Sequence, residues 1–177
     1  QHDCESYILP GLIDSHIHIE SSMLNPGSFA RAAVSRGTTA VVSDPHEIAN
    51  VLGIRGIDYM MDDASKVPLR FYFGAPSCVT DTSFDSSGAI LHYEAVRELL
   101  ERPSVNYLSE MMNFPGILSG EANAHDEVAA TLAANKVVTG HYSIPDTGAG
   151  LNAYIESGVS CCHESTRAED ALEKIRR

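Results

Sequence analysis

Residues 7–22 read YILPGLIDSHIHIESS, an apolar run that closes on two histidines spaced by one residue and then becomes polar. Residues i and i+2 of a β-strand point to the same face, so a strand ending at His18 presents the imidazoles of His16 and His18 side by side. Two convergent neutral imidazoles supply half of a metal site. A bare HxH can also be a pair of surface or core histidines, but the polar residues that follow are typical of the catalytic end of a barrel strand.

The composition of the 177 residues is that of an ordinary globular domain, with 44% hydrophobic and 20% charged residues. The net charge of −12 argues against a nucleic-acid or anionic-membrane partner, because both require clustered Lys and Arg. No apolar run approaches the roughly 18 residues of a membrane span. The four cysteines, of which Cys161 and Cys162 are adjacent, do not resemble a secreted disulfide framework. We therefore expect a cytoplasmic protein.

Short β-branched runs alternate with helical patterns along the chain. The predicted strands are 8–18, 38–43, 69–75, 104–110, 136–141 and 158–163, and the predicted helices are 27–36, 51–65, 92–101, 123–134, 149–157 and 167–177. Ser165 or Thr166 would cap the last helix, with Glu169 placed as in a capping box.

This alternation of strands and helices predicts an α/β fold with parallel strands and right-handed crossovers. Six units with polar residues at the strand ends favour a partial TIM-type (β/α)8 barrel over a doubly wound sheet. No glycine-rich phosphate loop follows any strand, which weakens the nucleotide-binding alternative.

Four of the six predicted strands end in a candidate metal ligand. Besides His16 and His18, these ligands are Glu110, His141 and His163. A carboxylate between imidazoles can bridge two divalent ions and hold a shared water, whose pKa then falls toward neutrality. The nitrogen and oxygen ligands are compatible with Zn, Mn or Fe(II).

The same residues carry a family resemblance. The segment GLIDSHIH (11–18) resembles the opening motif of the amidohydrolase superfamily of metal-dependent hydrolases. Longer stretches resemble the bacterial adenine deaminase family within it, namely HIHIESSMLNP (16–26), GTTAVVSDPHEIANVLG (37–53), EMMNFPG (110–116), GHYS (140–143) and CCHEST (161–166). The resemblance implies two divalent ions, usually Mn(II) or Fe(II), on His16, His18, bridging Glu110, His141 and His163. It also implies hydrolysis of adenine to hypoxanthine and ammonia.

The mechanism that the resemblance implies is attack of a metal-activated hydroxide on C6 of the purine, followed by proton transfer and loss of ammonia. Glu20 lies two residues past His18 and is the candidate catalytic group for substrate contact or proton transfer, with a solvated loop carboxylate as the alternative. His46 and Glu47 end the second strand and could hold an additional ion, orient the substrate, or play a structural role in their turn.

Two further residues are candidates for binding the substrate. Asn113 and Phe114 lie just past Glu110, where they could hydrogen-bond to and stack on a flat base.

The resemblance also predicts the organisation of the chain. We expect residues 1–8 to be the tail of a preceding β-rich domain and 9–177 to be an incomplete barrel. The superfamily completes its metal site with an aspartate at the end of an eighth strand. We therefore expect an internal fragment of a larger deaminase, inactive by itself and a homo-oligomer when full length.

Two alternatives remain. One is another binuclear amidohydrolase that acts on a cyclic amide, in which a carboxylated lysine often replaces the bridging glutamate. No lysine ends any of the four ligand-bearing strands, which favours the deaminase. The other alternative is a non-catalytic remnant that binds metal without turnover.

Overall fold

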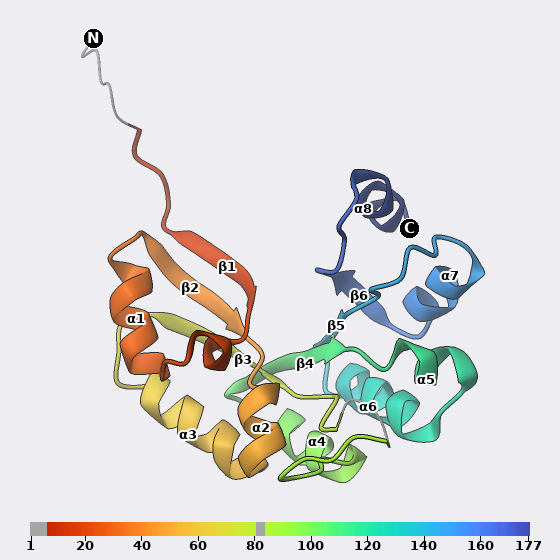
Figure 1. The fold of residues 1–177 in the computed structure, drawn as a ribbon, viewed down its shortest axis with the longest axis horizontal. Coiled ribbons are helices and arrows are strands. Elements are labelled where there is room, and N and C mark those ends of the chain that lie inside the picture. The colour runs from red at the N-terminus through yellow and green to blue at the C-terminus, as the bar shows by residue number, and fades with distance from the viewer. Residues whose placement is uncertain (1–6, 81–83) are drawn as a thin grey trace.

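The computed structural model describes residues 7–80 and 84–177, which form one curved parallel sheet with helices on its convex side (Figure 1). Its strands are β1 (Leu12–Ile17), β2 (Thr38–Ser43), β3 (Arg70–Ala75), β4 (Val105–Met111), β5 (Val137–Gly140) and β6 (Val159–Cys162). The strands lie in the order β1-β2-β3-β4-β5-β6, and every neighbouring pair is parallel. The sheet is therefore a half-barrel, and all six strands end at one edge.

Helices separate the strands. They are α1 (Pro26–Val34), α2 (His46–Leu52), α3 (Ile54–Ala64), α4 (Tyr93–Leu100), α5 (Phe114–Ser119), α6 (Ala122–Ala133), α7 (Ala149–Glu156) and α8 (Ala168–Ile175), with a short 3-10 helix η1 (Ile19–Ser22) after β1. Among the described residues, no helix has the length and apolar character needed to cross a membrane.

The main core lies between the sheet and the helices α2 to α7. Its fully buried members include Ile57, Val96, Leu99, Leu108, Val138 and Leu151. Burying one aliphatic side chain of this size stabilises the fold by about 1.5–3 kcal/mol. Two smaller clusters, one around Met60 and Phe73 and the other around Val41 and Leu69, continue the core toward β1 and β2. The carboxyl ends of β4 and β5, next to the candidate ligands Glu110 and His141, thus pack against the largest cluster of buried side chains.

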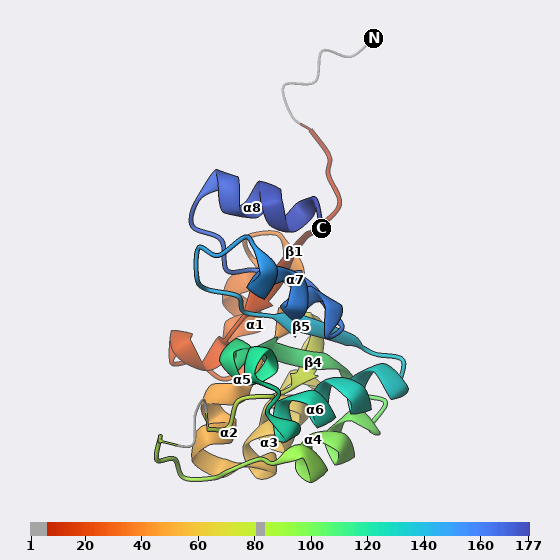
Figure 2. The same cartoon turned by 90° about the vertical axis from the view of Figure 1, so that its right-hand side faces the viewer.

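All six predicted strands are present, although the first is shorter than predicted. Residues 7–11 are exposed and run away from the sheet (Figures 1 and 2), because pairing with β2 begins only where Leu12 meets Thr38. Of the segment 1–8, residues 1–6 lie outside the described residues. A preceding β-rich domain stays a prediction.

The helix predictions need three corrections. The single helix predicted over 51–65 is wrong, because α2 already begins at His46 and Gly53, with φ 61° and ψ −146°, separates it from α3. The short helices η1 and α5 were not predicted, since each is little more than one turn long. The capping box is also wrong: α8 has Arg167 at its N-cap, and the Arg167 guanidinium pairs with Asp170 at 2.6 and 2.8 Å.

Candidate metal centre

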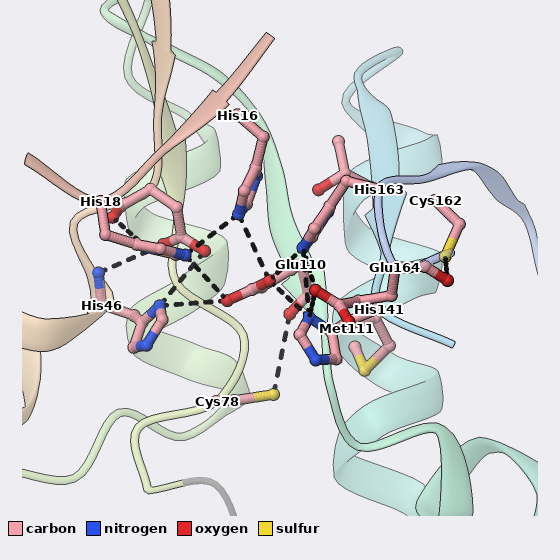
Figure 3. Close-up of polar contacts among 12 residues, drawn as sticks. His16, His18, His46, Cys78, Glu110, Met111, His141, Cys162, His163 and Glu164 are labelled. Carbon is pink, nitrogen blue, oxygen red and sulfur yellow. Dashed lines mark hydrogen bonds and ion pairs between the residues drawn. The ribbon is translucent and has the colours of Figure 1, made fainter. Parts of the chain in front are cut away.

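Glu110, near the end of the central strand β4, lies at the middle of a cluster of histidines (Figure 3). Its side chain is only 3% exposed. Oε2 lies 2.7 Å from Nδ1 of His141, 2.8 Å from Nε2 of His163 and 3.4 Å from Nε2 of His16. This oxygen therefore faces three imidazoles, one from β1 and two from the residues that directly follow β5 and β6.

The other carboxylate oxygen of Glu110 faces a second pair of histidines. Oε1 lies 3.4 Å from Nε2 of His18 and 3.4 Å from Nδ1 of His46, the first residue of α2. Asp44, fully buried at the end of β2, places Oδ2 3.3 Å from the same His46 nitrogen. One carboxylate thus divides the site into two halves with different donors.

The imidazole nitrogens also crowd one another. Nε2 of His16 lies 3.0 Å from Nε2 of His18, and Nδ1 of His141 lies 3.2 Å from Nε2 of His163. The rings of His16 and His163 stack with their centroids 3.6 Å apart, although they come from the first and last strands. Imidazole nitrogens gathered this closely can all face one shared cation.

The donor atoms form groups of the size that a divalent ion requires. The groups are His16, Glu110 and His163; His18, Asp44, His46 and Glu110; and His141, His163 and Glu164, with the atoms of each group within 4.8 Å of one another. Among the described residues, Oδ2 of Asp44 is a buried atom without a hydrogen-bond partner. Imidazole and carboxylate ligands suit Zn, Mn and Fe(II). The residues present therefore fit divalent ions.

Local hydrogen bonding prepares His18 for this role. Its Nδ1 lies 3.1 Å from the carbonyl oxygen of Asp44, and the N–H of Asp44 donates to the carbonyl of Ile17 at 3.0 Å. A carbonyl can only accept, so Nδ1 of His18 carries a hydrogen, and Nε2, which faces Glu110, is the nitrogen that a metal would bind. The β1–β2 junction thus fixes the tautomer that a metal needs.

The electrostatics of the cluster keep Glu110 ionised. Burial by itself raises the pKa of this carboxyl, but hydrogen bonds from His141 and His163 and the charges of nearby histidines outweigh it, so its pKa lies well below the ordinary value. Burial, and next the neighbouring His163, lower the pKa of His16. Burial also acts to lower the pKa of His141, but the hydrogen bond with Glu110 leaves it above the ordinary value.

Two side chains that were not predicted from the sequence hold the ligand strands together. Ser77 Oγ donates to the carbonyl of Glu110 at 2.7 Å. The buried Tyr154 hydroxyl donates to the carbonyl of Met111 at 2.6 Å and accepts from the N–H of His141 at 3.0 Å. Tyr154 therefore ties the end of β4 to the ligand that follows β5. Nothing in the spacing of these residues signals such contacts.

Glu20 and Glu47 lie beside the cluster and contact α2 and η1. Oε1 of Glu20 accepts the N–H of Ile48 at 3.1 Å, which caps the first turn of α2 from η1. Burial raises the pKa of Glu20. Glu47 accepts a hydrogen bond from Ser21. Neither carboxylate belongs to a metal-ligand group among the described residues, and their proposed roles stay predictions.

Asn113 and Phe114 both make contacts within the protein. Oδ1 of Asn113 accepts the N–H of Gly116 at 2.9 Å and caps α5, while its Nδ2 donates to Glu121 at 2.8 Å. The ring of Phe114 packs edge-on against Tyr142, with centroids 5.0 Å apart. Binding of a substrate by these two residues stays a prediction.

Imidazoles at the carboxyl ends of parallel β/α strands, gathered around one buried carboxylate, form a candidate metal site on a β/α half-barrel. A family model described as "Amidohydrolase family" matches residues 7–176, and the chain belongs to this family.

Several curated relatives are similar to the chain over nearly its whole length. It is 54% identical to an adenine deaminase of Clostridium botulinum (strain ATCC 19397 / Type A) over 171 residues, which are 96% of this chain and 28% of that protein. It is 53% identical to an adenine deaminase of Methanosarcina barkeri over 177 residues, 99% of this chain and 32% of that protein. It is 50% identical to an adenine deaminase of Sulfurovum sp. over 175 residues, which are 98% of this chain and 32% of that protein. The chain thus spans less than a third of the length of these relatives.

Proposed function

We propose that this chain supplies the metal-binding part of an adenine deaminase, which hydrolyses adenine to hypoxanthine and ammonia. The observation that carries the proposal is the convergence of His16, His18, His141 and His163 on Glu110. We infer the substrate from the relatives, which are named adenine deaminase and are 50–54% identical to this chain.

Two divalent ions, Mn(II) or Fe(II) with Zn(II) as the further candidate, would be held by the four histidines on either side of Glu110. When bound, such ions supply a nucleophilic hydroxide at neutral pH. The ionised Glu110 offsets their positive charge from a buried position. Asp44 and His46 add two donors to the half of the site that contains His18. We include in the proposal an additional ion held by these two donors.

The remaining groups would act on the substrate and its protons. Glu20 is the proposed proton-handling group, because it lies beside the cluster and burial raises its pKa above the ordinary value. In this structure Glu20 also caps α2, which begins at His46. A Glu20→Gln variant therefore reports on proton transfer, since the amide oxygen retains the acceptor for the cap.

The test is ammonia release by the purified full-length protein after reconstitution with Mn(II) or Fe(II) under anaerobic conditions. We expect adenine to be converted to hypoxanthine, adenosine to be left intact, and chelation of the metal to abolish the reaction. Hydrolysis of a cyclic amide without ammonia from adenine would replace the proposal by the other amidohydrolase activity. Stoichiometric metal binding without any turnover would leave a non-catalytic metal protein.

A further inference from the structure

The histidines that follow β5 and β6 lie just beyond the paired part of those strands. The last pair in the β5–β6 register is Gly140 with Cys162. His141 and His163 each come one residue later, where the ladder no longer fixes the distance between the two backbones. Their imidazole nitrogens are nevertheless only 3.2 Å apart. Oε2 of Glu110 contacts both imidazoles, but the backbones that carry them need a contact of their own to keep this spacing.

Lys174, a half-buried residue of α8, makes that contact. Its Nζ donates to the carbonyl of Tyr142 at 2.8 Å, to the carbonyl of Glu164, and to Sγ of Cys162 at 3.3 Å. Tyr142 directly follows His141, and Glu164 directly follows His163. The three acceptors match the three hydrogens of an ammonium group, and both carbonyls belong to residues next to a ligand.

Cys162 strengthens the link between the two turns. Its sulfur accepts the N–H of Tyr142 at 3.3 Å as well as the hydrogen bond from Lys174. The turn after β5 and the turn after β6 are thus joined directly through the sulfur and again through the ammonium. Hydrogen bonds from a charged donor are about twice as strong as neutral ones.

We propose that Lys174 is a positioning residue that sets the spacing of His141 and His163 and thereby the affinity for the ion that this pair holds. The inference rests on the metal centre of the proposed function but not on the identity of the substrate. The Lys174 ammonium group is itself a hydrogen-bond donor and offers no lone pair to an ion. It acts through the carbonyls of Tyr142 and Glu164, which directly follow the two histidines, and through the sulfur of Cys162.

Lys136 provides a matched control within the same chain. Its Nζ donates to three carbonyls in the same manner, those of Val105 at 2.6 Å, Arg102 at 3.0 Å and Leu100. These acceptors lie where α4 leads into β4, at the edge of the sheet opposite to the metal centre. Loss of Lys136 thus removes equivalent hydrogen bonds at a place where no ligand depends on them.

The experiment measures Co(II) binding by the full-length apo-protein, through chelator competition and the visible absorption of the bound ion. We expect Lys174→Met to weaken the binding of one Co(II) by about tenfold or more and to change its absorption bands, because outer contacts of ligands affect affinity by this factor. Lys136→Met is expected to lower the stability to urea and to leave both Co(II) affinities and the spectrum unchanged. Lys174→Arg, which keeps a charged donor, is expected to restore most of the affinity.

Each outcome decides the proposal. Unchanged Co(II) affinity and spectrum in Lys174→Met would overturn it, and so would an equal loss of affinity in Lys136→Met, which would reveal general destabilisation. Should Lys174→Met fail to fold, Lys174→Gln decides between the same outcomes, since it retains a shorter and uncharged donor. A wild-type protein that binds no Co(II) would refute the proposed metal centre itself, which is a distinct result.

Discussion

The carboxylate of Glu110 is the negative charge at the centre of the histidine cluster. It is ionised, almost fully buried, and within 3.4 Å of nitrogens from five histidines. An isolated buried carboxylate would be expensive, so this one requires positive charge nearby. The geometry supplies that charge either from protonated imidazoles in the apo-protein or from bound cations.

Glu110→Gln should therefore reduce metal binding as well as turnover. The amide keeps the shape of the side chain but removes the negative charge between the two halves of the site. We expect the full-length variant to retain about one ion per subunit or fewer, measured by elemental analysis after desalting. Glu127→Gln, which alters a buried carboxyl away from the ligand cluster, is the control and should keep its metal. Wild-type metal content in Glu110→Gln would contradict the bridging role.

Glu127 itself makes stability depend on pH. Burial raises the pKa of this carboxyl to about 8, while its Oε1 accepts a hydrogen bond from Asn123 at 2.8 Å. The folded protein thus holds a proton that the unfolded chain releases above its ordinary pKa of 4.5. Stability is full below that value and falls as pH rises toward 8, by up to about 1.4 kcal/mol per pH unit.

We expect Glu127→Gln to remove this slope, because the amide remains neutral at every pH. Urea unfolding of the full-length protein between pH 5 and pH 8 measures the effect, with exposed Glu94→Gln as the control. At pH 8 the Glu127→Gln variant should be the more stable protein by on the order of 3 kcal/mol. A parallel fall in stability for wild type and variant would show that Glu127 is ionised in the fold.

Individual residues of the site differ in how far the sequence reveals them. The side-chain period of two and the position at strand ends were enough to predict His16, His18, Glu110, His141 and His163, which the structure brings together. Tyr154 and Lys174 could not be predicted, because their contacts join helices to strand ends that only the folded backbone brings close. Asp44 lies two residues before His46 in the segment 37–53. The orientation of its carboxylate toward the His46 ring also depends on the fold.

At the scale of elements, the junction between α2 and α3 shows what a pattern of apolar residues cannot reveal. The periodic spacing continues through Gly53, so it predicts one helix where the structure has two. Only the φ and ψ of Gly53 break the pattern, and they separate α3 from a helix, α2, whose first residue His46 lies 3.4 Å from Glu110. Strand order was easier to predict, because alternating strands and helices leave few ways to connect a parallel sheet.

A substitution at Gly53 should therefore cost more than one at another glycine with positive φ. The angles of Gly53 (φ 61°, ψ −146°) suit glycine alone, whereas those of Gly120 (φ 79°, ψ 33°) are left-handed helical and are also accessible to asparagine. We expect Gly53→Asn to lower the free energy of unfolding by about 1–3 kcal/mol and Gly120→Asn by less than about 1 kcal/mol. Urea unfolding of the full-length variants measures both, and equal losses would contradict the argument.

At the scale of the whole molecule, the half-barrel leaves two strands with one neighbour each. Within the described residues β1 pairs only with β2 and β6 only with β5, and a closed barrel of this type has eight strands. Apolar side chains of β1 such as Leu12 and Ile13 are 60% and 66% exposed. Open edges and exposed apolar strands favour association with other chains.

The 177 residues expressed by themselves should consequently aggregate and show no deaminase activity. Size-exclusion chromatography and an ammonia assay with adenine measure the two properties, with the full-length protein as the control. We expect large oligomers or precipitate and no ammonia above background. A monomeric chain that melts cooperatively and deaminates adenine would show that the half-barrel is self-sufficient.

The contact between the His16 and His163 rings also has a consequence for biosynthesis. These rings stack at 3.6 Å, yet they come from the first and last strands of the sheet. At about 5–20 residues per second, a ribosome needs on the order of ten seconds to pass from one histidine to the other. An ion that meets the nascent chain in that interval finds an incomplete ligand set, because His163 is still absent. We therefore expect the metal content of the full-length protein to follow the ions that surround the completed chain and not those present when its synthesis begins.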